Sequence, residues 1–219
     1  MSRVESPYEY YMRLQNIINA ILKIRKYIPN AIIFLQELPA SNHGGSEAFP
    51  ENIKYKDYFI KKFNELLNSN KITRLENTGS ELALICPNNQ QFTFIEENKD
   101  VRFTSYSSNK VVGEIYINVH LVYKKNTIQD IEIIIESVLK YKSKPKIIYI
   151  VGDFNKNIVK KSIFDIEKFK EKYKMIKNIN IYSTTKNVGF SSSNNKIVGV
   201  SENNYTNLEY ILQIELSNY

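Results

Sequence analysis

The sequence has a single cysteine among its 219 residues, so it cannot form an intramolecular disulfide bond. Cys86 follows the apolar residues 82–85, a setting typical of a small buried hydrophobic residue in a strand. The sequence therefore predicts a structural cysteine and argues against a catalytic thiol.

Long apolar runs are also missing. The N-terminal residues 1–11 carry Arg3, Glu5 and Glu9 and have no apolar core of a signal peptide, and no later segment is long and apolar enough to span a bilayer. These absences predict a soluble, cytoplasmic protein. Export of a bacterial effector through a dedicated secretion machine would leave the same sequence features.

The charge is basic, with a formal net charge of +7 and a sequence pI near 9.2. Such a balance favours acidic partners such as nucleic acid or phosphorylated lipid, because bound Lys and Arg release condensed counterions. However, no basic cluster stands out, and Lys, Asn, Ile and Tyr are abundant throughout, as an AT-rich genome would produce. A solvated basic surface is the alternative interpretation.

Helix and strand patterns alternate along the chain without a fixed repeat or a low-complexity linker. Ser6 and Pro7 form a helix start, and helical spacing of apolar residues predicts helices at residues 7–28, 59–67, 127–141 and 165–175. Strands are predicted at residues 31–35, over much of 71–123, at 146–151, and as short strands after 175. The pattern predicts one layered α/β domain, residues 1–219, with two packed sheets and outer helices.

Glu37 lies just past the first predicted strand, where α/β sheets usually present reactive groups. Its carboxylate can offer oxygen to a hard cation such as Mg²⁺. The alternative is an ordinary helix or turn residue.

A second segment, residues 116–121, alternates polar and apolar side chains. Strand geometry puts Asn118 and His120 on one face and the apolar residues on the other. The imidazole could protonate a leaving oxygen or hold a phosphate, with the carboxamide orienting it. A structural histidine is the alternative.

The third segment, Gly152-Asp153-Phe154-Asn155, is the most specific. Asp153 and Asn155 can converge on one point, where a carboxylate and an amide could position a water and stabilise a pentacoordinate phosphorus. A simple turn is the alternative, because Gly, Asp and Asn all favour turns.

In order and spacing, these three segments resemble the motifs of the endonuclease/exonuclease/phosphatase superfamily, the magnesium-dependent phosphodiesterases that include DNase I. Residues 80–85 and 208–212 are similar to two further family segments, so the resemblance spans about residues 8–212. Residues 36–41 are most similar to the DNase I-like subunit of cytolethal distending toxin.

The resemblance implies a DNase I-like fold, a four-layer sandwich of two mixed β-sheets flanked by helices. It also implies roles for single residues. Glu37 and Asp153 would bind Mg²⁺ or Mn²⁺, and Asp153 would orient the attacking water. His120 would act as acid or phosphate ligand, Asn155 would stabilise the transition state, and Asn118 would support them.

The chain departs from the family pattern at both ends. The first family strand, which carries an Asn, and the last, which carries an Asp-His pair, are missing, and Glu209 stands where the late motif has Asp. The only histidines are His43 and His120, and neither has the position of the closing His, although His43 in its glycine-flanked loop is a candidate substitute. Losing that histidine predicts an impaired site.

Three interpretations follow. The first is an impaired metal-dependent phosphodiesterase acting on nucleic acid or on another phosphodiester, such as a phosphorylated lipid or sugar. The second is a catalytically inactive pseudoenzyme that uses the same scaffold to bind a protein or nucleic acid. The third is an incomplete chain. The first is preferred, because a fully relaxed site would have little reason to keep four polar groups in the family order.

Overall fold

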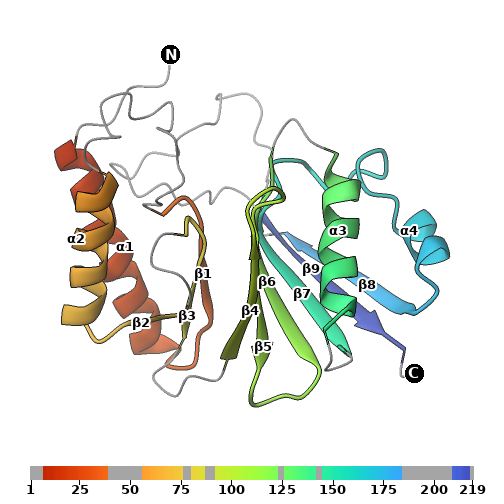
Figure 1. The fold of residues 1–219 in the computed structure, drawn as a ribbon, viewed down its shortest axis with the longest axis horizontal. Helices are drawn as coiled ribbons and strands as arrows, with labels where there is room; N and C mark the ends of the chain where they lie inside the picture. Colours follow the sequence, from red (N-terminus) through yellow and green to blue (C-terminus); the bar gives the residue numbers. More distant parts are fainter. Residues whose placement is uncertain are drawn as a thin grey trace. The chain divides into compact units, whose positions relative to one another are not determined.

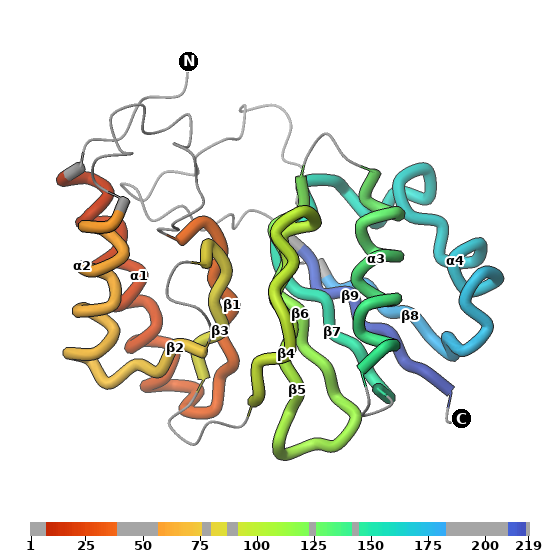
Figure 2. Tube along the Cα trace, in the orientation of Figure 1, coloured from red at the N-terminus to blue at the C-terminus, as the bar shows by residue number. Residues whose placement is uncertain are grey.

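A computed structural model describes residues 7–38, 56–75, 80–86, 92–122, 126–141, 145–183 and 209–217, which Figure 2 draws in colour. The chain divides into two compact units. The first contains α1 (Pro7–Tyr27), β1 (Ile33–Leu35), α2 (Lys56–Ser69), β2 (Thr73–Leu75) and β3 (Ala83–Cys86). The single domain predicted for residues 1–219 stays a prediction.

The second unit contains six strands and two helices (Figure 1). They are β4 (Phe92–Asn98), β5 (Phe103–Ser108), β6 (Glu114–His120), α3 (Thr127–Leu139), β7 (Ile147–Asp153), α4 (Ile166–Lys172), β8 (Ile176–Ser183) and β9 (Glu209–Leu216). No helix of the described ranges is long and apolar enough to cross a membrane.

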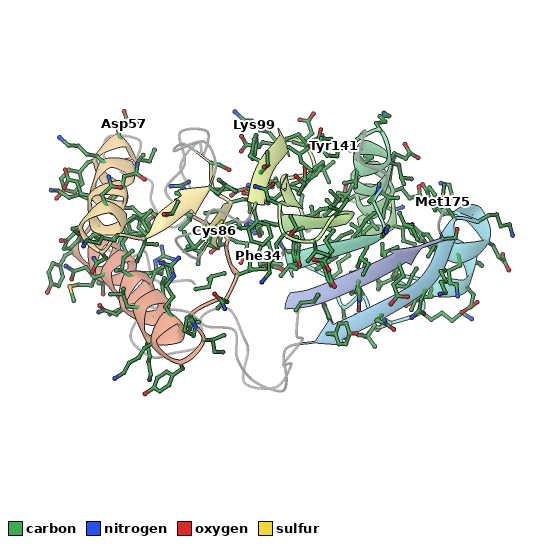
Figure 3. All side chains as sticks on the ribbon, turned by 90° about the horizontal axis from the view of Figure 1, so that it is seen from below. Phe34, Asp57, Cys86, Lys99, Tyr141 and Met175 are labelled. Carbon is green, nitrogen blue, oxygen red and sulfur yellow. The ribbon has the colours of Figure 1, made fainter. Side chains whose placement is uncertain are left out.

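In the first unit, two helices cover a small antiparallel sheet with strand order β1-β3-β2. Pro7 begins α1, as its fixed φ favours, and the helix ends at Tyr27, before the residue preceding Pro29 is reached. Leu14 of α1, Phe63 of α2 and Ile85 of β3 are buried in one apolar cluster. Cys86 is buried at the end of β3, as predicted, and Figure 3 labels it near Phe34 of the neighbouring strand.

The sheet of the second unit has the order β4-β5-β6-β7-β9-β8 and is mixed. β6 and β7 run parallel, joined by a crossover through α3, and every other neighbouring pair is antiparallel. The three-stranded sheet of the first unit is antiparallel, so only one of the two sheets is mixed. The expected α/β fold with two sheets flanked by helices is confirmed.

One face of the six-stranded sheet forms the main core. Ile117 of β6, Ile150 of β7 and Leu212 of β9 are fully buried there with Ile134 of α3 and Phe169 of α4. Both helices therefore cover this face (Figure 1). The opposite face carries the alternate residues of each strand, and these are largely polar or aromatic.

The C-terminal part of the second unit differs from expectation. The helix predicted over residues 165–175 is only Ile166–Lys172, capped by the Asp165 side chain, because Tyr173 leaves helical geometry with φ −109 and ψ 78. β8 and β9 are eight residues each, not short strands. Their length comes from the pairing of β8 with β9 and of β9 with β7, which the residues of one strand cannot indicate alone.

Candidate functional site

Parallel pairing of β6 and β7 puts His120 directly beside Asp153, each at the C-terminal residue of its strand. Antiparallel pairing of β7 and β9 puts Glu209 beside Asp153 on the other side. Neighbouring strands lie about 4.8 Å apart. Three internal strands thus bring His120, Asp153 and Glu209 into one row at the end of the sheet where β6 and β7 end.

Asn155 folds back onto this edge. Its backbone is left-handed, with φ 51, which an asparagine tolerates better than most residues. Its backbone N–H donates to Oδ1 of Asp153 at 2.7 Å, and its Nδ2 donates to the backbone carbonyl of Leu121 at 2.7 Å. The backbone N–H of Leu121 in turn donates to the carbonyl of Asp153 at 2.8 Å. These bonds fix the Asp153 carboxylate and tie the ends of β6 and β7 together.

Phe154, between Asp153 and Asn155, anchors this segment in the core. Phe154 is fully buried in the main core and contacts the ring of Tyr210 edge to face, with centroids 6.0 Å apart. Burial also raises the pKa of the Tyr210 hydroxyl above its ordinary value. Gly152, just before, has φ 138, a backbone conformation that strongly favours glycine. Gly152 and Asp153 therefore end β7, and the bend at Asn155 leaves two polar side chains at the end of this strand.

Asn118 and His120 lie on the face opposite the helices, as the alternation predicted. Asn118 is fully buried and His120 is 8% exposed, whereas Ile117, Val119 and Leu121 belong to the helix-side core. Buried polar side chains need hydrogen-bonding or charged surroundings, so this face of the sheet must be polar near the C-terminal end of β6. The arrangement fits an imidazole held for interaction with a phosphate.

Glu37 belongs to the first unit, while the other predicted site residues belong to the second. It follows β1, is exposed, and has a left-handed backbone with φ 55, which is costly for glutamate. The neighbouring Leu38 is buried and donates its backbone N–H to the carbonyl of Glu81 at 3.0 Å. The gathering of Glu37 with the other three residues stays a prediction, and His43 lies outside the described residues.

The sequence did not identify Arg102 as part of this region. Its carbonyl accepts the backbone N–H of His120 at 3.0 Å, and its own φ is 59. Arg102 is the last residue of the turn between β4 and β5, where Figure 3 labels Lys99. The Asn98-Lys99-Asp100 turn signal could have indicated a hairpin here, but not that its backbone would support His120.

A metal site can be tested against the donors in the described ranges, which contain no cluster of three or more His, Cys, Asp or Glu side chains suited to a metal ion. Mg²⁺ does not require such a cluster, because it usually keeps several waters and binds through one or two carboxylates plus substrate phosphate. The Asp153 carboxylate, held by the Asn155 N–H, is a donor of the right chemical type. Asp153 could therefore contribute one oxygen ligand to such an ion.

No protein-family model and no curated protein matches the sequence. Several solved structures are similar. ANGEL2, described as a 2',3'-cyclic phosphatase and solved with adenosine-2',3'-vanadate, is 16% identical over 71% of this chain and 48% of its own, with a TM-score of 0.38. Humanized D. rerio TDP2 is 9% identical over 94% of this chain and 92% of its own, with a TM-score of 0.43.

A functionally unknown conserved protein from Enterococcus faecalis V583 is 10% identical, covers 100% of this chain and 97% of its own, and has a TM-score of 0.45. This chain spans about half the length of ANGEL2. At such low identity, what this chain does depends on its own site residues.

Proposed function

We propose that this chain is a Mg²⁺- or Mn²⁺-dependent phosphodiesterase with an impaired site, acting on nucleic acid or on another phosphodiester. The observation that supports it most is the register of β6 and β7, which sets His120 beside Asp153 while Asn155 folds back onto the same edge. An imidazole, a carboxylate and a carboxamide at one sheet edge are the groups that phosphoryl chemistry uses.

Each group has a distinct task in this proposal. Asp153 orients the attacking water, and its carboxylate is held in place by the Asn155 N–H. His120 donates a proton to the leaving oxygen or binds the phosphate. Asn118, which is buried two residues before His120 in β6, supports the imidazole. The Asn155 carboxamide stabilises the negative charge of the transition state.

In this proposal Glu37 and Asp153 would hold the divalent cation, as the resemblance to the family motifs implies. The ion would polarise the phosphoryl oxygens when bound. Because Glu37 precedes a buried anchor, Leu38, its backbone position is fixed within the first unit although its side chain is exposed.

A catalytically inactive binding module is the second candidate, and one observation favours it. The Nδ2 of Asn155 already donates to Leu121, and the Asp153 carboxylate already accepts from Asn155. Both side chains therefore have structural roles that would preserve them without catalysis. Such a module would bind a protein or a nucleic acid through the same edge.

Metal-dependent hydrolysis separates the two candidates. Cleavage of supercoiled plasmid and of bis(p-nitrophenyl) phosphate is measured with Mg²⁺ or Mn²⁺ and with EDTA. Asp153→Asn keeps an oxygen that accepts the Asn155 N–H, so the fold should persist while the rate falls by about 10² or more. Glu37→Gln should also lower the rate, through loss of a metal ligand.

The matched control is Glu167→Gln, which neutralises an exposed carboxylate on α4 of the same unit. It should hydrolyse both substrates at the wild-type rate. Equal metal-dependent rates for wild type and Asp153→Asn would rule out the enzyme and leave the binding module.

A further inference from the structure

An aromatic and apolar patch lies next to the candidate site, on the face of the sheet opposite α3 and α4. Tyr182 of β8 and Ile211 of β9 are cross-strand partners, and Val151 of β7 is the partner of Ile211 on the other side. Tyr182 is 50% exposed and Ile211 is 38% exposed. We call Val151, Ile211, Tyr182 and the adjacent Gln213 the Tyr182 platform.

The Tyr182 ring is held along the surface of the sheet. Its hydroxyl donates to Oε1 of Gln213 at 2.9 Å, and Gln213 is the cross-strand partner of Asn180, two residues before Tyr182. The side chain must therefore extend diagonally from β8 toward β9. Asn180 donates to the same oxygen at 3.4 Å and helps to hold Gln213. A tethered, half-exposed ring loses little conformational entropy when a planar ligand stacks on it.

The platform begins at Val151, two residues before Asp153 in β7. Val151 and Asp153 point to the same face because they are two residues apart in β7, and two residues of a strand span about 7 Å. Ile211 is a diagonal neighbour of Asp153 across one strand spacing. A ligand whose phosphate lies beside Asp153 can thus place an attached ring over Ile211 or Tyr182.

We propose that the Tyr182 platform stacks a nucleobase of a single-stranded nucleic acid whose phosphodiester lies at the candidate site. The assignment rests on the proposed function. Nucleic acid carries a planar base for each phosphodiester, and the face of that base is available for stacking only when the strand is unpaired. A basic chain of net charge +7 suits such a polyanion. A phosphorylated lipid or sugar has no planar ring to stack here.

Binding is measured by fluorescence anisotropy with Asp153→Asn protein, which binds without cleaving, and labelled single-stranded DNA or RNA of ten nucleotides in Mg²⁺ buffer. The comparison ligand is an abasic oligomer of equal length and charge. Tyr182→Ala should weaken binding of the base-containing strand about tenfold or more and leave the abasic strand unchanged. Tyr182→Leu, which keeps apolar contact with the sheet but has no ring, should behave in the same way if the alanine variant folds poorly.

Two controls sharpen the result. Tyr182→Phe keeps the ring and loses only the Gln213 tether, so it should retain most of the affinity for the base-containing strand. Tyr27→Ala removes a tyrosine of 71% exposure from α1 in the other unit and should leave binding unchanged. An equal effect of Tyr182→Ala and Tyr182→Leu on both strands, no effect on either, or no binding of any oligomer overturns the platform.

The outcome is separable from that of the proposed function. Binding that depends on the Tyr182 ring together with an absence of hydrolysis by wild type would refute the enzyme and retain the platform. Hydrolysis of single strands that is independent of Tyr182 would retain the enzyme and refute the platform.

Discussion

The side-chain amide of Asn155 donates a hydrogen bond to the backbone carbonyl of Leu121, with Nδ2 and O 2.7 Å apart. The two residues are 34 positions apart in the sequence, and each follows the end of a strand that carries a candidate site residue. Because β6 and β7 are parallel, no turn joins these ends directly. This bond and the Leu121-to-Asp153 backbone bond therefore hold His120 and Asp153 in register where the ladder ends.

Two substitutions of Asn155 distinguish the contribution of its side-chain hydrogen bond to stability from that of its backbone conformation. Asn155→Gly loses the bond to Leu121 but suits the left-handed φ of 51, so we expect a loss of about 0.5–1.5 kcal/mol in unfolding free energy. Asn155→Ala loses the same bond and also puts a Cβ in a disfavoured conformation, for about 1–3 kcal/mol. Urea denaturation measures both. Equal stability of the two variants would show that the backbone at this position is not strained.

The start of the β6–β7 pairing depends on Gly113. Its φ is 93, its carbonyl accepts the backbone N–H groups of Lys146 and Ile147, and a Cβ there would lie 2.9 Å from Cγ of Lys146. Gly113→Ala should therefore destabilise the protein by about 1–3 kcal/mol in urea denaturation, through backbone strain. Lys146→Ala removes the close side chain. If steric contact alone matters, the double variant recovers most of the loss; if φ matters, it does not.

Attachment of α4 to the sheet should depend on Phe169 far more than on the ion pair of Lys172. Phe169 is 3% exposed in the main core, so Phe169→Ala should cost about 3–5 kcal/mol. Lys172 and Glu132 of α3 are 2.7 Å apart, but the lysine side chain is 55% exposed. Lys172→Met should therefore change stability much less than Phe169→Ala does. Thermal and chemical denaturation of both variants check this order, and a larger effect of Lys172→Met would contradict it.

The sequence predicted the second unit well where a local pattern determines the structure. Alternation over residues 116–121 separated the helix-side core from Asn118 and His120, because side chains in a strand point to opposite faces. The start of α3 at Thr127 follows from the cap at Asn126, whose side chain accepts the Ile128 N–H. These features depend on neighbours in the sequence and are visible without the fold.

Contacts between distant segments could not be predicted in the same way. The sequence indicated that Asp153 and Asn155 converge, but not that Asn155 binds Leu121 or that Arg102 supports His120, because both acceptors are backbone carbonyls. Every residue has a carbonyl, so no residue type marks these two. The order β7-β9-β8 likewise depends on pairing between segments that no local pattern links.

Cys86 should make stability fall with rising pH in the alkaline range. Burial raises the pKa of its thiol to about 11, although the positive charge of the nearby Arg25 guanidinium lowers this pKa. Its backbone carbonyl also accepts a hydrogen bond from that guanidinium. The unfolded chain ionises first, near pH 9, while the folded chain stays protonated. The contribution of Cys86 to unfolding free energy is therefore complete below about pH 9 and is lost as the pH rises toward 11.

Guanidinium denaturation of wild type and Cys86→Ala at intervals from pH 8 to 11 tests this. The alanine variant should be less stable at pH 8, because it leaves a small cavity in a fully buried position. It should also lose less stability than wild type up to pH 11, since it has no thiol to ionise in the unfolded state. Buried tyrosines such as Tyr116, whose pKa is also raised by burial, add a slope of the same sign to both proteins. Parallel pH profiles would mean that the Cys86 thiol ionises equally in the folded and unfolded chain.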